Sequence, residues 1–193
     1  MKSKVLNLKD FKTKQWSGGK TTELFIYPSN SDFEKKNFDF RISTATVEVE
    51  ESNFTPLPNI LRHLMVLNGE INIAHKNHHK SHLAKYQIDS FEGDWETTSV
   101  GTYIDFNLMT KGNTQGKLSS LHITSQKKVE ILLNSTNEFM MFYSFETAIE
   151  FKINSEKRKL NQGELLLIEN PLNEKIQFSS EKSCALAVVE IRG

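Results

Sequence analysis

Residues 70–74 read EINIA, residues 83–85 read LAK and residues 91–94 read FEGD. Apolar and polar residues alternate in EINIA, as they do in a strand with one buried face. The glycine of FEGD suits a tight turn, because glycine adopts a positive φ without steric cost. These residues predict a β-hairpin, a turn of glycine and acid, and then a further strand.

The same order of elements returns in the second half of the chain. A hairpin with AIEFKI at 148–153 leads to NQGE at 161–164 and then to the apolar strand LLLI at 165–168. Hairpin, glycine-acid turn and strand are typical of the cupin jelly roll, a double-stranded β-helix. Its repetition predicts two barrels in one chain, a bicupin. The polar, glycine-rich residues 112–116 predict a boundary between two domains, residues 1–111 and residues 117–193. We expect the two domains to form one compact unit.

The rest of the chain also predicts strands. No segment of twelve or more residues has the apolar stripe of an amphipathic helix. Short runs rich in β-branched and aromatic residues recur at about twelve-residue spacing, as in all-β sandwiches and barrels. The predicted strands are 21–27, 39–49, 61–67, 70–74, 81–85, 95–100, 103–109, 117–123, 128–133, 139–143, 148–153, 157–160, 164–168, 174–178 and 185–191.

The composition of the 193 residues excludes several classes of protein. Lys and Arg together number 24, as do Asp and Glu, so the chain lacks the net positive charge expected of a nucleic-acid or anionic-membrane partner. No apolar run nears the ~20 residues of a membrane span, and the charged N-terminus lacks the apolar core of a secretory signal. The one cysteine, Cys184, cannot form an internal disulfide. We expect a cytoplasmic protein with no nucleic-acid and no membrane partner.

Histidines are the first candidates for chemistry in a cupin, because divalent metals bind clustered histidines and a carboxylate. Four of the six histidines fall within residues 75–82, which read HKNHHKSH. Such a tract is either a metal site or a solvated hairpin tip, and its lysines would repel a cation. No His-x-His motif followed by a glutamate lies on a predicted strand. We therefore expect a solvated tip, no metal and no other cofactor.

Polar side chains gather on one face of several predicted strands. Arg41 and Ser43 share a face of one strand and Asp105 and Asn107 share a face of another, because side chains alternate between the faces. Arg62 interrupts a strand that is otherwise almost wholly apolar. The planar fork of arginine binds carboxylates in a way that lysine does not. These polar faces either line a ligand cavity inside a barrel or simply face water.

Several short motifs carry a resemblance to a known family. In order along residues 16–109, the chain resembles the HutD/Ves family in WSGGKTTE at 16–23, FRIS-x-A at 40–45, FT-x-LP-x-x-x-R at 54–62, L-x-G at 67–69, F-x-GD at 91–94 and DFNLM at 105–109. The resemblance implies a bicupin fold without a catalytic metal or an established enzymatic activity. It also implies binding of a small acyl-amino-acid carboxylate, such as formylglutamate, by a protein that restrains histidine catabolism or takes part in a stress response.

The candidate site follows from the chemistry of a carboxylate ligand. Arg41 and Arg62 would clamp the carboxylate with charge-assisted hydrogen bonds. Asp105 would balance the arginine charge, because a buried arginine without a partner is costly. Glu23 would pair with an arginine or receive a ligand ammonium group.

Three further residues complete the predicted site. Ser43 and Asn107 would hydrogen-bond an amide or formyl group, and Trp16 would form an apolar wall. The expected function is thus that of a metal-independent cupin that binds a small carboxylate and acts in regulation or sensing.

Three alternatives use the same residues differently. In the first, Arg41–Asp105 and Arg62–Glu23 are salt bridges that only fix the barrel. In the second, the chain is a metal-free or metal-dependent isomerase or hydrolase, with Glu23 or Asp105 as the base of the metal-free reaction. That reaction requires a carboxyl with a raised pKa and no arginine neighbour, because a nearby arginine lowers the pKa of the carboxyl and weakens this alternative. In the third, the chain is a structural module that forms a homodimer through its sheet faces and has no cavity between the arginines and Asp105.

Overall fold

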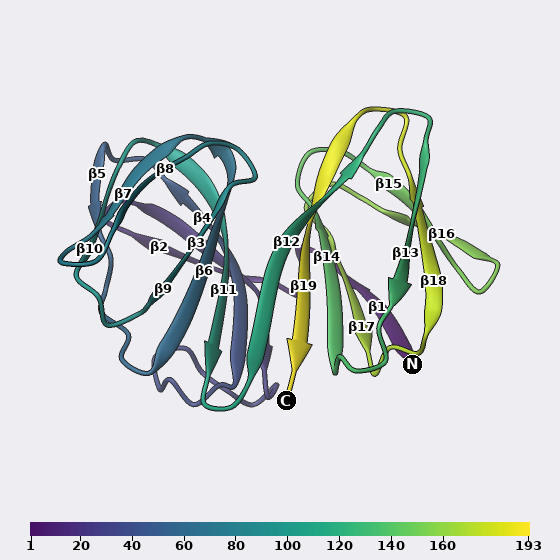
Figure 1. Ribbon diagram of the computed structural model, residues 1–193, viewed down its shortest axis with the longest axis horizontal. Helices are drawn as coiled ribbons and strands as arrows, with labels where there is room; N and C mark the ends of the chain where they lie inside the picture. The colour runs from purple at the N-terminus through teal and green to yellow at the C-terminus, as the bar shows by residue number, and fades with distance from the viewer. The chain divides into compact units, whose positions relative to one another are not determined.

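The computed structural model describes residues 1–193 as nineteen β-strands without a helix, which confirms the all-β class (Figure 1). All fifteen predicted strands are present, and four more appear: β1 (Lys2–Leu6), β2 (Lys12–Trp16), β5 (Glu51–Asn53) and β9 (Ile88–Glu92). Every residue of β2 is exposed, so it has no apolar alternation that a sequence pattern could detect. None of the elements is a helix of the length and apolarity that crossing a bilayer requires.

The chain divides into two compact units, and the first consists of residues 11–116. Its remaining strands are β3 (Gly19–Tyr27), β4 (Phe40–Val47), β6 (Ile60–Gly69), β7 (Ile71–His75), β8 (Lys80–Leu83), β10 (Thr97–Val100) and β11 (Tyr103–Lys111). They form a six-stranded sheet in the order β2-β3-β4-β11-β6-β9 and a four-stranded sheet in the order β5-β10-β7-β8. Every neighbouring pair in both sheets is antiparallel.

The second unit consists of residues 1–10 and 117–193. Besides β1 its strands are β12 (Gln115–Ile123), β13 (Lys128–Leu133), β14 (Phe139–Ser144), β15 (Ile149–Ile153), β16 (Glu156–Leu160), β17 (Leu165–Glu169), β18 (Glu174–Ser179) and β19 (Cys184–Arg192). They form a five-stranded sheet in the order β1-β17-β14-β19-β12 and a four-stranded sheet in the order β13-β18-β15-β16.

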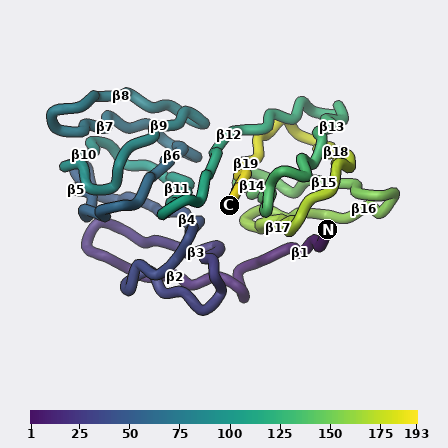
Figure 2. The backbone as a smooth tube through the Cα atoms, turned by 60° about the horizontal axis from the view of Figure 1, so that its bottom comes forward, coloured from purple at the N-terminus to yellow at the C-terminus, as the bar shows by residue number.

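The first strand corrects the expected domain boundary. Residues 1–111 were predicted to form one barrel, but β1 pairs antiparallel with β17 of the other unit, from Lys2 opposite Glu169 to Leu6 opposite Leu165. Figure 2 shows this purple strand next to β17 of the second unit. The strand β17 is apolar along almost its whole length, and β1 covers an edge that would otherwise offer unpaired backbone groups. Composition located the break near residue 116 but gives no sign of this pairing.

The two units differ in what fills their interiors. In the second unit, fully buried Phe142, Phe151 and Phe178 belong to one apolar cluster that draws on both sheets. The first unit also has apolar clusters, but it buries Arg41 and Arg62 as well. Burying a charged side chain is costly without polar partners, so the interior of the first unit must contain polar surroundings. This contrast places the candidate site in residues 11–116.

Candidate functional site

A cavity of about 550 Å³ lies within the unit of residues 11–116. Its wall comes from β2, β3, β4, β6 and β11, together with residues 31–36 and 52–57. All seven residues that the sequence analysis selected lie on this wall: Trp16, Glu23, Arg41, Ser43, Arg62, Asp105 and Asn107. The cavity contradicts the third alternative, which required that no hollow lie between the two arginines and Asp105.

The register of three neighbouring strands explains why these side chains meet. Ser43 of β4 lies opposite Asn107 of β11, and Arg41 lies opposite Met109. On the other side of β11, Met109 lies opposite Arg62 of β6. Directly paired residues in a sheet point to the same face. The two guanidinium groups therefore enter the cavity from strands on either side of β11.

Arg41 is held by an ion pair with Glu23. Its Nε donates to Oε2 of Glu23 at 2.8 Å, and its Nη1 donates to Oγ of Ser43 at 3.1 Å. Glu23 of β3 reaches Arg41 because it lies opposite Ser43, two residues along β4. The first alternative paired Arg41 with Asp105 and Arg62 with Glu23. This pairing is wrong, because Glu23 binds Arg41.

Arg62 has much weaker partners. Its Nη2 donates to Oδ1 of Asn107 over 3.5 Å, and its Nε is buried without a hydrogen-bond partner. The guanidinium carbon lies 4.8 Å from the ring centre of Phe54 and 5.2 Å from that of Phe91, within cation–π range. Burial lowers the pKa of Arg62 to about 10, against the attraction of Asp105, so the group stays charged at neutral pH. Arg62 is a buried cation with most of its five N–H donors unused.

The pKa of Asp105 is shifted upward, whereas that of Arg62 is shifted downward. Burial raises the pKa of Asp105 to about 7, although the charge of Arg62 and hydrogen bonds from the Ala45 amide and the Asn107 side chain oppose the rise. Asn107 thus bridges the two groups, since it donates to Asp105 and accepts from Arg62. Because the carboxyl is only partly ionised at neutral pH, Asp105 does not fully balance the charge of Arg62.

The glycines of the WSGG motif fix the position of Trp16 on the cavity wall. Gly19 has φ of 148°, and a Cβ atom there would collide with the carbonyl oxygen of Thr46. A Cβ atom on Gly18 would overlap the ring of Trp16. These two positions therefore need glycine, which lets the β2–β3 turn close with the indole packed over it. Trp16 remains 38% exposed at the cavity, consistent with the predicted apolar wall.

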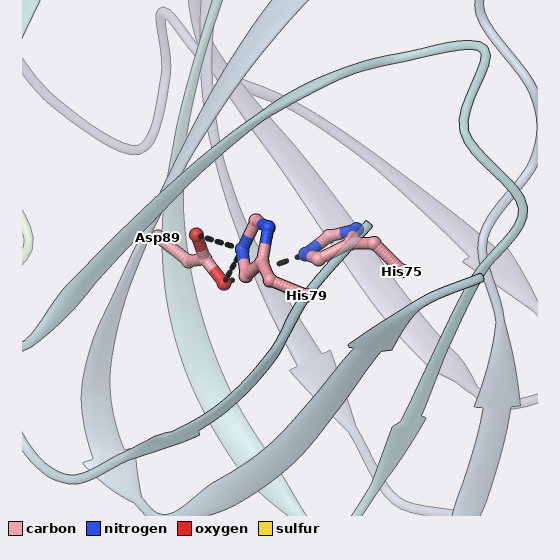
Figure 3. Close-up of side chains that lie close together, drawn as sticks. All are labelled: His75, His79 and Asp89. Atoms are coloured by element: carbon pink, nitrogen blue, oxygen red, sulfur yellow. Dashed lines mark hydrogen bonds and ion pairs between the residues drawn. The ribbon is translucent and has the colours of Figure 1, made fainter. Parts of the chain in front are cut away.

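The histidine tract is not the fully solvated tip that we expected. His75 is buried at the end of β7, and its ring meets those of His79 and Phe91 at centroid distances of 4.5 and 4.4 Å. Figure 3 shows His75 and His79 directed at the carboxylate of Asp89. Local sequence patterns did not reveal this cluster, because Asp89 lies on β9, one of the four strands that they did not predict. None of the three residues lies on the wall of the cavity.

Solved structures share this fold at low sequence identity. A conserved protein of unknown function from Pseudomonas aeruginosa has a TM-score of 0.86 at 19% identity, over 100% of both chains. HutD from Pseudomonas fluorescens has a TM-score of 0.72 at 20% identity, again over 100% of both chains. Vicilin from Solanum melongena has a TM-score of 0.71 at 12% identity, over 97% of this chain and 84% of the vicilin chain. The chain therefore has a cupin-like β fold.

Comparison at the level of sequence identifies the family. No curated protein matches the chain. The sequence profile described as HutD matches residues 8–188, which include almost the whole of both units. The motif-based resemblance, which rested on residues 16–109, is thus confirmed over a longer range. The chain belongs to the HutD family.

Proposed function

We propose that the cavity binds a small carboxylate, such as an acyl amino acid of the formylglutamate type, and that the chain regulates or senses a pathway through this ligand. The proposal includes two cupin barrels, a metal-independent ligand site and a role in histidine catabolism or a stress response, as the resemblance implies. One observation carries it: Arg62 is buried beside the cavity with a single 3.5 Å hydrogen bond and an Nε that has no partner.

A carboxylate supplies what Arg62 lacks. Arginine presents paired N–H groups that match the two oxygens of a carboxylate, and such charge-assisted bonds are stronger than neutral ones. Arg41 by contrast is already paired with Glu23, so it orients and supports the ligand. Lys12 and Lys36 also lie on the cavity wall and add positive potential for an anion.

The size and the polarity of the cavity fit a ligand of this class. Its volume of about 550 Å³ lies within the usual range for small-molecule sites, roughly 300–1,000 Å³. Ser43 and Asn107 offer polar atoms for an amide or formyl group, and Trp16 offers an apolar face. The vicilin from Solanum melongena is described as holding different anionic ligands in structurally similar pockets. That description is of the vicilin, and it supports an anion as the ligand class here.

Calorimetric titration with N-formylglutamate, and with its uncharged diamide as the matched compound, tests the proposal. The acid should bind and the diamide should not. Because one charged hydrogen bond is worth about 1.5–3 kcal/mol, Arg62→Ala should weaken binding by roughly 10- to 100-fold. Arg158→Ala, a change on β16 in the other unit, is the control and should leave the affinity unchanged.

Two results of these binding measurements would reject the proposal. If a panel of small mono- and dicarboxylates and acyl amino acids neither binds nor raises the melting temperature, the cavity is no carboxylate site. If an acid binds equally well to wild type and to Arg62→Ala, the site lies elsewhere. A conservative Arg62→Lys variant, which keeps the charge but loses the fork, guards against loss of folding and should also bind more weakly.

One observation favours an enzyme as the second candidate. A carboxyl with a pKa of about 7 is suited to proton transfer at neutral pH, and Asp105 has this value. In a metal-free isomerase or hydrolase Asp105 would act as the base, with the charge of Arg62 opposing the rise of its pKa. Glu23, the other candidate base, is paired with Arg41 and does not meet the requirement for a carboxyl without an arginine neighbour. Incubating the protein with N-formylglutamate and following the compound by NMR tests this candidate: turnover that Asp105→Asn abolishes, with binding retained, supports it. No change in the compound rejects it for this substrate.

A further inference from the structure

Three side chains outside the cavity bring metal-binding atoms together. They are His75 at the end of β7, His79 in the hairpin that follows, and Asp89 on β9 (Figure 3). His79 Nε2 lies 2.9 and 3.1 Å from the two carboxylate oxygens of Asp89, and His75 Nε2 lies 3.4 Å from Oδ2. All three ligand atoms lie within 4.8 Å of one another.

The Thr97 hydroxyl holds the ring of His75 in place. It lies 2.8 Å from Nδ1 of His75 and donates to the carbonyl oxygen of Trp95 at 3.1 Å. With Nδ1 engaged in this way, Nε2 of His75 faces Oδ2 of Asp89 at 3.4 Å. A metal ion binds a neutral imidazole through a nitrogen lone pair, so Nε2 is the atom of His75 that an ion beside Asp89 would use.

Asp89 supplies the negative charge of the cluster. Its carboxylate oxygens contact His79 Nε2 at 2.9 and 3.1 Å, and Oδ1 accepts from the Ser90 amide at 2.8 Å. A cation placed among the three side chains would take a carboxylate oxygen and the two Nε2 atoms as ligands. The hydrogen that Nε2 of His79 donates to Asp89 would then move to Nδ1 of the same ring or to solvent.

We propose that His75 Nε2, His79 Nε2 and the Asp89 carboxylate bind one divalent transition-metal ion, with zinc the best match. Zinc takes imidazole and carboxylate ligands at about 2.0–2.2 Å in a tetrahedron, which sets ligand atoms about 3.3–3.6 Å apart. The two Nε2 atoms lie 2.9 and 3.4 Å from the Asp89 carboxylate and all ligand atoms lie within 4.8 Å of one another, so side-chain shifts of about 1 Å or less would reach this spacing. Water fills the fourth position, and the ion enters past the side chain of His79, which is 39% exposed.

The surroundings support a bound ion. The Thr97 hydroxyl fixes the orientation of His75, as outer-shell partners of metal ligands do. Of the lysines that would repel a cation, Lys76 is paired with Glu96 at 2.7 Å. Trp95 lies against the cluster, with its ring centre 5.5 Å from that of His75 and 5.8 Å from that of His79.

The placement of the ligands indicates what the ion does. His75 and His79 belong to the β7–β8 hairpin of the four-stranded sheet, whereas Asp89 belongs to β9 of the six-stranded sheet. An ion bound by all three ties the two sheets of this unit together, independently of the ligand cavity. We therefore expect the metal to stabilise the unit of residues 11–116 by mass action, since the unfolded chain lacks the site.

The test uses the full-length chain without a histidine tag, stripped of metal with a chelator and titrated with Co²⁺ and then Zn²⁺. One equivalent of Co²⁺ should give the visible absorption of a tetrahedral site and quench the fluorescence of Trp95, and Zn²⁺ should displace it. Zn²⁺ should also raise the midpoint of unfolding followed by tryptophan fluorescence. Binding of N-formylglutamate to the cavity is measured in the same samples and does not depend on this result.

Variants separate this site from adventitious binding. His79→Ala and Asp89→Asn each remove one ligand, so their affinity for Co²⁺ should fall by at least about 100-fold, beyond what loss of an outer-shell partner costs. His82→Ala is the matched control, because His82 is exposed on the same hairpin and should leave binding unchanged. Absence of stoichiometric binding, or equal binding by wild type and His79→Ala, overturns the proposal. His79→Gln provides a second variant if the alanine variant fails to fold.

Discussion

Replacing Asp105 by asparagine isolates the effect of a buried carboxyl on stability. Burial raises the pKa of Asp105 to about 7, whereas an aspartic acid in an unfolded chain titrates near pH 4. Between these two values the native chain holds a proton that the unfolded chain has released. The free energy of unfolding of the wild type therefore falls as the pH rises through this window. Asparagine has a similar shape and does not titrate, so the variant lacks this dependence.

The magnitude follows from the width of that window. A shift of roughly three pH units, at about 1.4 kcal/mol per unit, corresponds to about 4 kcal/mol. The contribution of Asp105 is fully present below about pH 4, is lost progressively up to about pH 7, and is constant above. The free energy of unfolding of Asp105→Asn minus that of the wild type should therefore rise by about 4 kcal/mol between pH 4 and pH 8.

The chain provides its own probe for this measurement. Both tryptophans, Trp16 and Trp95, lie in residues 11–116, so tryptophan fluorescence during urea unfolding reports on this unit. Asp94→Asn, which removes an exposed carboxylate from the same unit, is the control and should show a flat difference over the same pH range. A flat difference for Asp105→Asn as well would contradict a raised pKa of Asp105, because the buried carboxyl would then be ionised over the whole pH range.

Two further predictions concern the fold. Gly19→Ala places a Cβ atom against the Thr46 carbonyl oxygen at a positive φ, and should lower the free energy of unfolding seen by tryptophan fluorescence by about 1–3 kcal/mol. Gly112→Ala, at a positive φ with open space around it, should cost less, and an equal loss would contradict the role of the clash. Deleting residues 2–6 removes β1 and should lower the melting temperature of the second unit, measured by circular dichroism, while the tryptophan transition stays unchanged. A shift of the tryptophan transition alone would contradict the assignment of β1.

The strand pattern was largely predictable, and two of the four strands that were missed share a cause. Strands such as β7 and β15 alternate buried and exposed residues, which is a local property of the sequence. The missed strand β2 is exposed throughout, and β1 buries only its last residue, so both exist because a neighbouring strand supplies hydrogen-bond partners. Such partners lie far away in the chain, and local alternation cannot indicate them.

The candidate site was predictable for a different reason. Arg41 and Ser43 stood out because they alternate with apolar residues along one strand, and Arg62 stood out because it interrupts an almost wholly apolar strand. Period-two geometry predicts that such residues share a face, and the structure places them on one cavity. The partners of each arginine were not predictable, because pairing depends on the relative register of β3, β4 and β11. For this reason Glu23 pairs with Arg41 and not with Arg62.

The all-β class, the positions of fifteen strands, the family and the polar residues of the cavity could be predicted from the sequence, because all of them depend on short-range patterns of residue type. The fold was needed to show that β1 joins the second unit, that Arg62 is left with few partners, and that His75, His79 and Asp89 meet. Each of these depends on which strands lie side by side. Strand neighbours are set by the packing of the whole chain, which no local pattern contains.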